Sequence, residues 1–308
     1  MKRPPTNVAH SVRTRLQKVA KESGEEFHYT LTRYAIERLL VRLAASEHGD
    51  NFVLKGAMLF RVWSAVAHRT TRDLDLLGSG APDLDRLAEV FAEICTLTVE
   101  DDGVVYDASS VRAARIKEDA DYEGVRVTLR AMLGTARLDV QVDVGFGDAI
   151  TPAPVEILFP TLLATPAPRL LAYPKETVVA EKLNALVDLG LANSRMKDFF
   201  DLAFLARTSA FDGTTLARAI AATFARRKTP LPAAGLLPLG LTAEFYEDDA
   251  KQKQWKAFTS RIAPTDEPLS SVVALLAAFL GPPLAHAATP ERFRMTWAPS
   301  GPWAQGDG

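Results

Sequence analysis

The residues best suited to chemistry lie in the motif TRDLD at positions 71–75. Asp73 and Asp75 are one residue apart and alternate with leucine. Because successive side chains of a strand point to opposite faces of a sheet, we expect both carboxylates on one face of a strand at residues 71–77. Paired carboxylates supply the oxygen ligands that Mg²⁺ takes in proteins. The motif therefore predicts a magnesium site.

A third carboxylate is expected from the strand predicted at residues 137–146, where apolar and polar residues alternate. Asp143 is the candidate, and Asp139, which shares its face, is the alternative. Three carboxylates can hold two ions that bind a triphosphate and activate an attacking hydroxyl for in-line displacement at phosphorus. An Asp-x-Asp pair also occurs on solvated strand faces that have no function, so its spacing alone does not establish the site.

A glycine turn precedes the acidic motif. Residues 51–56 have strand character and end at Gly56, and residues 57–67 have helical character. Backbone N–H groups at such a turn can approach phosphate oxygens, so Lys55 and Gly56 are predicted to bind nucleotide. An ordinary strand-to-helix turn is the alternative. Arg72 is predicted either to contact phosphate or to balance the acidic charge.

The elements that must position these residues fall into two parts. Helices are predicted at residues 11–45, with a break near Gly24, and at 83–97, and further strands at 112–117 and 124–133. Prolines at 152, 154, 160, 166, 168 and 174 forbid regular helix and indicate an extended connection. Beyond it, helices are predicted at residues 176–189, 196–206, 214–227, 242–260 and 269–280, before a tail that we expect to be loose at its end.

The composition indicates a globular protein, since 47% of the 308 residues are hydrophobic and 24% are charged. A net charge of −2 argues against a protein that coats nucleic acid by bulk electrostatics, although residues 2–21 can form a local basic surface. The single cysteine, Cys95, excludes an intrachain disulfide and is predicted to be buried. The histidines lack the spacing of a zinc site. Since no signal peptide or membrane span is evident, we expect a cytoplasmic protein.

Three groups of residues, separated along the chain, resemble the motifs of a known protein family. They are YAIERLL at 34–40 with FVLKGA at 52–57, TTRDLDL at 70–76, and YPKET at 173–177 with AEKL at 180–183 and RMKDFFDL at 195–202. Together they resemble the AbiEii/AbiGii toxin family of bacterial nucleotidyltransferases, which includes the MenT-like toxins. The resemblance extends over about residues 30–205, in matching order and separation.

The resemblance implies an α+β fold. A polymerase-beta-like nucleotidyltransferase domain with a mixed sheet would precede a helical bundle domain, with the active site between them. We expect the first domain and its N-terminal helices at residues 1–150 and a proline-rich connection at 151–174. The helical domain that completes the active site is expected at 175–285, and the tail at 286–308.

The resemblance also implies roles for individual residues. Asp73 and Asp75 match the family's metal-binding pair, and Lys182 matches a lysine that contacts nucleotide phosphate. Asp198 matches a further acidic residue needed for activity, which could orient that lysine or the attacking hydroxyl. Without the resemblance, Lys182 and Asp198 have the pattern of surface charges on amphipathic helices.

Near the motifs, Thr71 matches the family's pattern and Ala57 departs from the pattern of many nucleotidyltransferases. Thr71 stands where the family has a serine or threonine, so we expect it to contact phosphate or the metal's water, or to accept a modification by an antitoxin. Many nucleotidyltransferases have Gly-Ser at the turn, where this chain has Gly56 and Ala57. No serine hydroxyl is available there, and backbone donors would have to suffice.

These expectations combine into a toxin of a bacterial toxin–antitoxin system. It would use Mg²⁺ to transfer a nucleoside monophosphate from an NTP to RNA, with the 3′ end of tRNA as the expected acceptor, and so block translation. A cognate antitoxin is the expected partner. The basic N-terminal region and arginines of the helical part are expected to contact RNA phosphates, namely Arg195, Arg218, Arg226 and Arg227. Two alternatives stay open: nucleotidyl or phosphoryl transfer to a protein or small-molecule hydroxyl, and a non-catalytic nucleotide-binding partner protein.

Overall fold

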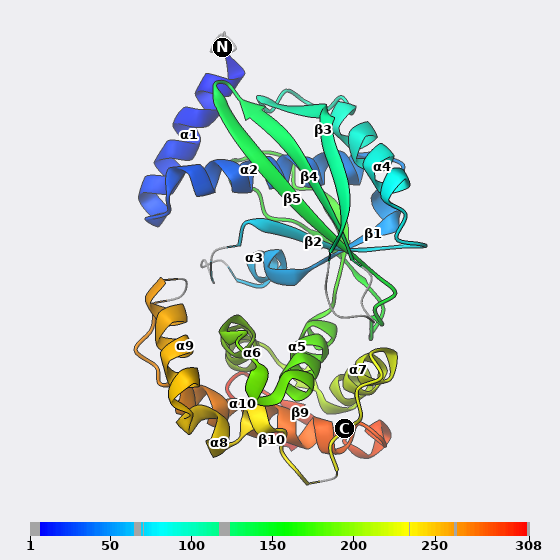
Figure 1. The fold of residues 1–308 in the computed structure, drawn as a ribbon, viewed down its shortest axis with the longest axis vertical. Helices are drawn as coiled ribbons and strands as arrows, with labels where there is room; N and C mark the ends of the chain where they lie inside the picture. The colour runs from blue at the N-terminus through cyan, green and yellow to red at the C-terminus, as the bar shows by residue number, and fades with distance from the viewer. Residues whose placement is uncertain are drawn as a thin grey trace. The chain divides into compact units, whose positions relative to one another are not determined.

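The computed structural model describes residues 7–64, 69, 71–116, 124–233, 235–261 and 264–306. Contacts divide the chain into two units (Figure 1). Unit 1 comprises residues 1–147 and 155–172, and unit 2 comprises residues 148–154 and 173–308. The functional domains expected from the sequence remain predictions.

Unit 1 is built on a seven-stranded sheet with the strand order β3-β4-β5-β2-β1-β7-β6. The strands are β1 Phe52–Lys55, β2 Asp73–Gly78, β3 Val104–Ile116, β4 Gly124–Leu133, β5 Ala136–Phe146, β6 Val155–Leu158 and β7 Arg169–Ala172. β2 is parallel to β5 and β1 is parallel to β7, whereas the other neighbours are antiparallel. The mixed sheet predicted for the α+β fold is therefore confirmed.

The N-terminal residues form two helices, α1 Val8–Ser23 and α2 Phe27–Ala45, which separate at Gly24 as predicted. Gly24 has φ 67°, in the left-handed region that glycine adopts without a steric cost. Its N–H donates to the carbonyl oxygen of Ala20 and ends the first helix. The longer α2 crosses behind β4 and β5 in Figure 1.

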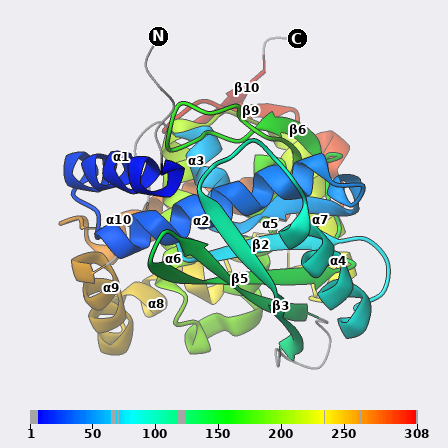
Figure 2. The same cartoon turned by 90° about the horizontal axis from the view of Figure 1, so that it is seen from above.

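Helix α4, Leu84–Thr96, begins at Asp83, whose side chain accepts a hydrogen bond from the N–H of Arg86. This helix contacts β3 and β4, while α2 contacts β5 (Figure 2). Cys95 on α4 is buried, and burial raises the pKa of its thiol to about 12. The prediction of a buried cysteine is confirmed.

The alternation of β5 separates two faces of the sheet. Apolar residues of this strand are at most 1% exposed, and they are Leu138, Val140, Val142 and Val144. The residues between them are exposed or half-buried, and they are Arg137, Asp139, Gln141 and Asp143. We call the face that carries this second set the open face of the sheet.

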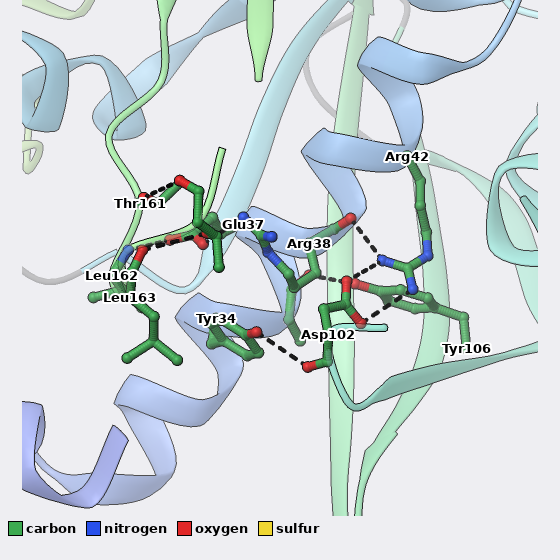
Figure 3. Close-up of polar contacts among 11 residues, drawn as sticks. Tyr34, Glu37, Arg38, Arg42, Asp102, Tyr106, Thr161, Leu162 and Leu163 are labelled. Atoms are coloured by element: carbon green, nitrogen blue, oxygen red, sulfur yellow. Dashed lines mark hydrogen bonds and ion pairs between the residues drawn. The ribbon is translucent and has the colours of Figure 1, made fainter. Parts of the chain in front are cut away.

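The buried side of unit 1 contains a polar network (Figure 3). The guanidinium of Arg42 on α2 donates to both carboxylate oxygens of Asp102, with the shorter N–O distance 2.7 Å. Tyr34 donates to the backbone carbonyl of Asp102 across 3.1 Å. Since these groups are buried, their mutual hydrogen bonds offset the cost of removing them from water.

Glu37 ties the same helix to the segment that precedes β7 (Figure 3). One carboxylate oxygen accepts from the guanidinium of Arg38 at 2.8 Å, and the other accepts from the backbone N–H of Leu162 at 2.6 Å. The Glu37 side chain is only 2% exposed. Burial raises the pKa of its carboxyl group, and the charge of Arg38 opposes that change.

The proline-rich stretch predicted as an extended connection contributes two strands to the sheet of unit 1. β6 and β7 pair with each other, and β7 pairs with β1 through Ala172 and Leu54. Neither strand contains a proline. The prolines flank the strands, where a missing N–H interrupts no ladder.

Unit 2 is mainly helical. Its longer elements are α5 Lys175–Leu189, α6 Met196–Thr208, α7 Gly213–Arg226, α8 Ala243–Glu247, α9 Asp249–Arg261 and α10 Leu269–Ala285. The single helix predicted at residues 242–260 is wrong, because extended backbone at Asp248 separates α8 from α9. No helix in the described ranges combines the length and apolar character that crossing a bilayer requires.

The last part of unit 2 forms a small sheet. β9 Met295–Trp297 pairs with β8 Phe211–Asp212 and with β10 Trp303–Gln305. The side chain of Trp297 is buried and donates its indole N–H to the carbonyl oxygen of Ala206 at 2.7 Å. Trp297 thus anchors part of the described tail by burying a large apolar ring, and the last two residues of the tail lie outside the described residues.

Candidate active site

A row of charged residues crosses the open face of the sheet at Asp75. The strand register places Asp75 of β2 opposite Asp143 of β5. Lys55 of β1 lies opposite Asp75, and Arg126 of β4 lies opposite Asp143. Directly opposite like charges destabilise a sheet, whereas opposite charges stabilise it. The two acids are therefore flanked by one base on each side.

Asp73 occupies the neighbouring row, opposite Gln141. It lies two residues before Asp75 on the same strand, so the two carboxylates share one face, as the alternation predicted. Asp73 is exposed and Asp75 is half-buried. The geometry thus provides two neighbouring carboxylates that solvent can reach.

The turn after β1 is shaped around Asp75. Gly56 has φ 71°, and a Cβ at this position would lie 1.9 Å from a carboxylate oxygen of Asp75. The absence of a side chain therefore makes room for the carboxylate. After Gly56 come the short 3₁₀ helix Gly56–Leu59 and α3 Phe60–Trp63. The helix predicted at residues 57–67 is therefore shorter than expected, because the backbone is extended at Ser64; residues 65–67 lie outside the described residues.

Asp143 is held by Arg126. Two parallel hydrogen bonds of 2.8 Å join the guanidinium to both carboxylate oxygens. Gln141 also donates to one of these oxygens, at 3.3 Å. Asp139, the alternative third carboxylate, lies opposite Arg130 and beyond the start of β2. The register therefore favours Asp143 over Asp139 as the neighbour of Asp75.

The segment before Asp73 is anchored to α2. The backbone N–H of Thr71 donates to the hydroxyl of Tyr29 at 3.0 Å, and the Thr71 hydroxyl lies 3.5 Å from the carbonyl oxygen of Asp73. Arg72 is exposed and lies 3.7 Å from the exposed carboxylate of Glu26. Its guanidinium therefore remains in water, where it can reach an anionic ligand.

Unit 2 contains a second group of predicted residues. The ammonium of Lys182 on α5 lies 2.6 Å from Asp198 and 2.8 Å from Asp201, both on α6. Both aspartate side chains are fully buried. Arg195 adds a 2.7 Å contact to the other oxygen of Asp198. The cluster brings together the predicted residues Lys182 and Asp198.

Asp201 is a member of this cluster that the sequence analysis missed. It follows Asp198 by three residues on one helix, a spacing that places both side chains on the same helical face. The spacing of three residues between the two aspartates was the signal in the sequence that could have identified Asp201.

Three of the four helical arginines predicted to contact RNA make ion pairs within unit 2. Arg195 contacts Asp198, Arg218 contacts Glu291, and Arg227 contacts Asp148 and Glu181. These contacts do not test the RNA role.

One further group of ligand-type residues lies elsewhere in unit 1. Atoms of Glu47, His48 and Glu93 lie within 4.8 Å of one another, the only such set of three or more in the described ranges. A 2.7 Å contact joins the His48 ring to the Glu93 carboxylate. The histidine thus has a partner that accounts for its position.

The chain matches a protein family over residues 38–287. That family is described as nucleotidyl transferase AbiEii toxin, type IV TA system. The chain belongs to the AbiEii family. The family resemblance inferred from the three groups of residues is confirmed, and with it the nucleotidyltransferase and toxin class.

Two crystal structures from Helicobacter pylori are similar to this AbiEii chain. JHP933 shares 16% identity over 84% of this chain and 90% of its own, with a TM-score of 0.47. A candidate nucleotidyltransferase shares 17% identity over 83% of this chain and 91% of its own, with a TM-score of 0.46. No curated protein matches the chain.

The AbiEii chain presents residues that fit a hard divalent cation. Asp73 and Asp75 offer carboxylate oxygens from one face, and Gly56 leaves the space that the Asp75 carboxylate occupies. Asp143 adds a third carboxylate beside Asp75, but both of its oxygens already accept from Arg126. Asp73 and Asp75 therefore fit a divalent cation better than the set of three aspartates that includes Asp143.

Proposed function

We propose that this AbiEii chain transfers a nucleoside monophosphate from an NTP to an RNA hydroxyl, with the 3′ end of tRNA as the acceptor. The observation that carries the proposal is the row of Lys55, Asp75 and Asp143, with Asp73 beside it. It gives an AbiEii chain the oxygen ligands and the flanking positive charge that a triphosphate substrate needs.

In the proposed reaction the acceptor hydroxyl oxygen forms a bond to the α-phosphorus. The bond from that phosphorus to the oxygen bridging to the β-phosphorus breaks, pyrophosphate leaves, and the hydroxyl proton passes to solvent. Mg²⁺ held by Asp73 and Asp75, with Asp143 as the proposed third ligand, would supply charge neutralisation of the phosphates.

The chain's own groups then have separate roles in the proposal. Lys55 places positive charge beside the carboxylates, and the backbone at Gly56, with Thr71 and Arg72, is proposed to bind phosphate oxygens. Lys182 is proposed to contact phosphate as a point charge. Asp198 is proposed to orient Lys182, in keeping with their 2.6 Å contact.

Membership of a toxin family supports a proposal for the biological role. We propose a cytoplasmic toxin that blocks translation by modifying tRNA, and a cognate antitoxin that neutralises it. A modification of Thr71 by the antitoxin would alter a residue two positions before Asp73.

Transfer of labelled nucleotide tests the proposal. Purified chain, Mg²⁺ and total tRNA are incubated with each α-³²P NTP and, separately, with each γ-³²P NTP. We expect α-label on RNA and none on tRNA whose 3′-terminal diol has been oxidised with periodate. Label from γ-³²P on protein, with no α-label on RNA, would replace the proposal with phosphoryl transfer.

Matched variants connect that reaction to the site. Asp75→Asn keeps the shape of the side chain but removes its charge, so we expect loss of transfer without loss of the fold by circular dichroism. Asp85→Asn on α4 is the control, since Asp85 lies in the first turn of that helix outside the row. Full activity in Asp75→Asn would remove Asp75 from the metal site.

A further inference from the structure

A pocket of about 470 Å³ in unit 1 borders Asp73 and is lined both by open-face residues such as Gln141 and by Val140 of the opposite face. β2 begins at Asp73, opposite Gln141, whereas β5 continues past this point to Ala136. The pocket lies where β5 extends beyond its neighbour, and the start of α2 also lines it. It is therefore continuous with the proposed metal site.

The pocket is rich in cationic groups. Arg72, Arg130 and Arg137 line it, against the two acids Asp73 and Asp139. Asp139 lies opposite Arg130 in the register. Since Asp73 is a proposed metal ligand, the lining has three arginines and one remaining acid, and Arg72 also lies 3.7 Å from the exposed carboxylate of Glu26. This local excess of positive charge contrasts with the net charge of −2 of the whole chain.

Polar groups between the arginines complete a surface suited to a sugar–phosphate chain. Thr128 contributes a hydroxyl group and Gln141 contributes an amide, whereas the hydroxyl of Ser110 donates to the carbonyl oxygen of Asp107. Within the described ranges, no hydrogen bond or ion pair engages the Arg137 guanidinium. Hydroxyl, amide and guanidinium groups are the donors that contact phosphate and sugar in protein–nucleic acid complexes.

The position of the pocket distinguishes the acceptor from the NTP. The Gly56 turn lies on the β1 side of β2, against Asp75, whereas the pocket lies on the β5 side. In-line displacement places the attacking and leaving oxygens on opposite sides of the phosphorus. With the triphosphate at the Gly56 turn, the attacking hydroxyl arrives from the β5 side.

We propose that this pocket binds the phosphodiester backbone of the acceptor RNA strand next to its reacting hydroxyl. Arg130 and Arg137 contact the phosphates, and the contacts do not depend on base sequence. The inference rests on the proposed function for the acceptor class. It adds a binding site to the carboxylate row, on strands β4 and β5.

Binding measured without NTP tests this site separately from catalysis. A short fluorescein-labelled single-stranded RNA is titrated with wild type and with the double variant Arg130→Gln/Arg137→Gln, at several salt concentrations, by fluorescence anisotropy. The log–log salt slope should fall by about 1.4, since each phosphate contact on a single strand contributes about 0.7. Binding of each NTP with Mg²⁺, by equilibrium dialysis, should be unchanged.

Two controls make the result specific. Arg130→Lys/Arg137→Lys keeps the charges and should retain most of the salt slope. Arg86→Gln removes an exposed arginine of α4 outside the pocket and should leave RNA binding unchanged. An unchanged slope in the Gln double variant, or an equal loss of NTP binding, would overturn the pocket assignment.

The labelled-transfer assay separates failure of this inference from failure of the proposed function. If wild type labels tRNA and the Gln double variant labels it with the same KM for tRNA, the function stands and the pocket assignment is wrong. If wild type labels a protein instead and the Gln variant weakens that labelling, the pocket binds a protein acceptor, which also overturns the RNA assignment.

Discussion

The carboxylate of Asp75 occupies the space where a side chain of Gly56 would begin. A Cβ there would lie 1.9 Å from Oδ2 of Asp75, well inside any van der Waals contact. The turn at Gly56 and strand β2 at Asp75 are thus packed closely against each other at the centre of the proposed site. The lack of a side chain at Gly56 therefore permits both the turn and the position of the Asp75 carboxylate.

Gly56→Ala should therefore reduce nucleotidyl transfer by about 100-fold, the scale expected when a reacting group is displaced by about 1 Å. The added methyl group forces the Asp75 carboxylate away. The rate is measured by the labelled-transfer assay at saturating Mg²⁺.

Gly80→Ala is the matched control. Gly80 also has a positive φ, 88°, but a Cβ there meets nothing within 4 Å. Both variants carry the left-handed strain of about 1–2 kcal/mol, and only Gly56→Ala adds the clash with Asp75. Equal activity in the two variants would show that Gly56 serves the turn alone.

Arg126→Gln should lower the Mg²⁺ concentration needed for half-maximal transfer. The guanidinium competes with a cation for both oxygens of Asp143. Because Arg126 is partly exposed, the pair is worth little, and we expect a shift of about twofold to fivefold.

Asp143→Asn should move the Mg²⁺ requirement in the opposite direction, and Arg86→Gln should leave it unchanged. Magnesium titrations of transfer rate measure all three. A variant series in which neither Arg126 nor Asp143 changes the requirement would remove Asp143 from the metal ligands.

Lys182→Met should destabilise the protein by about 3–5 kcal/mol, because a broken buried ion pair leaves charge without compensation. Asp201 in particular would keep its negative charge at a fully buried position. Urea denaturation followed by circular dichroism measures the change. Lys182→Arg should lose much less stability, since it retains the positive charge.

Lys197→Met provides the comparison for that experiment. Lys197 is an exposed lysine on the same helix as both aspartates, and its loss should change stability by little. Destabilisation of similar size in both lysine variants would show that the ion pairs of Lys182 with Asp198 and Asp201 do not stabilise the fold. Loss of activity in Lys182→Met should be interpreted together with this stability measurement.

Glu37→Ala should destabilise the protein by about 3–5 kcal/mol for a related reason. The change leaves the buried guanidinium of Arg38 without its partner and the N–H of Leu162 without its acceptor. Glu89→Ala, on the exposed face of α4, is the control. A loss near that of the control would mean that water replaces the carboxylate.

Glu37 also predicts a dependence of stability on pH. Burial raises its pKa in the folded protein, so the folded state holds the proton at pH values where the unfolded state has released it. The contribution of Glu37 is therefore greatest below its unfolded pKa and declines as pH rises through the folded pKa. Glu37→Gln, which cannot titrate, should lack this decline in urea denaturation at successive pH values. An identical pH profile in wild type and Glu37→Gln would contradict the raised pKa.

The strand with one buried and one solvent-exposed face was predicted most accurately from the sequence. The strand predicted at 137–146 agrees with β5 within one residue, because its valines alternate with polar residues. The break between α1 and α2 was equally clear, since Gly24 supplies a left-handed helix end. Local chemistry was enough in both cases.

Features that depend on distant partners were harder to predict. The start of β3 at Val104, eight residues before the predicted strand, is paired to β4 through a register shift between Asp107 and Arg112. The contact of Arg126 with Asp143 requires the register of two strands, and that of Lys182 with Asp201 requires the packing of two helices. A single sequence carries neither relationship.

The two-sided character of β5 has a genetic consequence. Point substitutions at its valines should impair folding, whereas those at its charged positions should impair toxicity in a protein that still folds. Insertion of a single residue would do both, because it moves every following side chain to the other face. In a growth-based screen, substitutions at either set of codons should therefore relieve growth inhibition, but only those at the charged positions should leave folded protein, and every single-codon insertion or deletion should remove both.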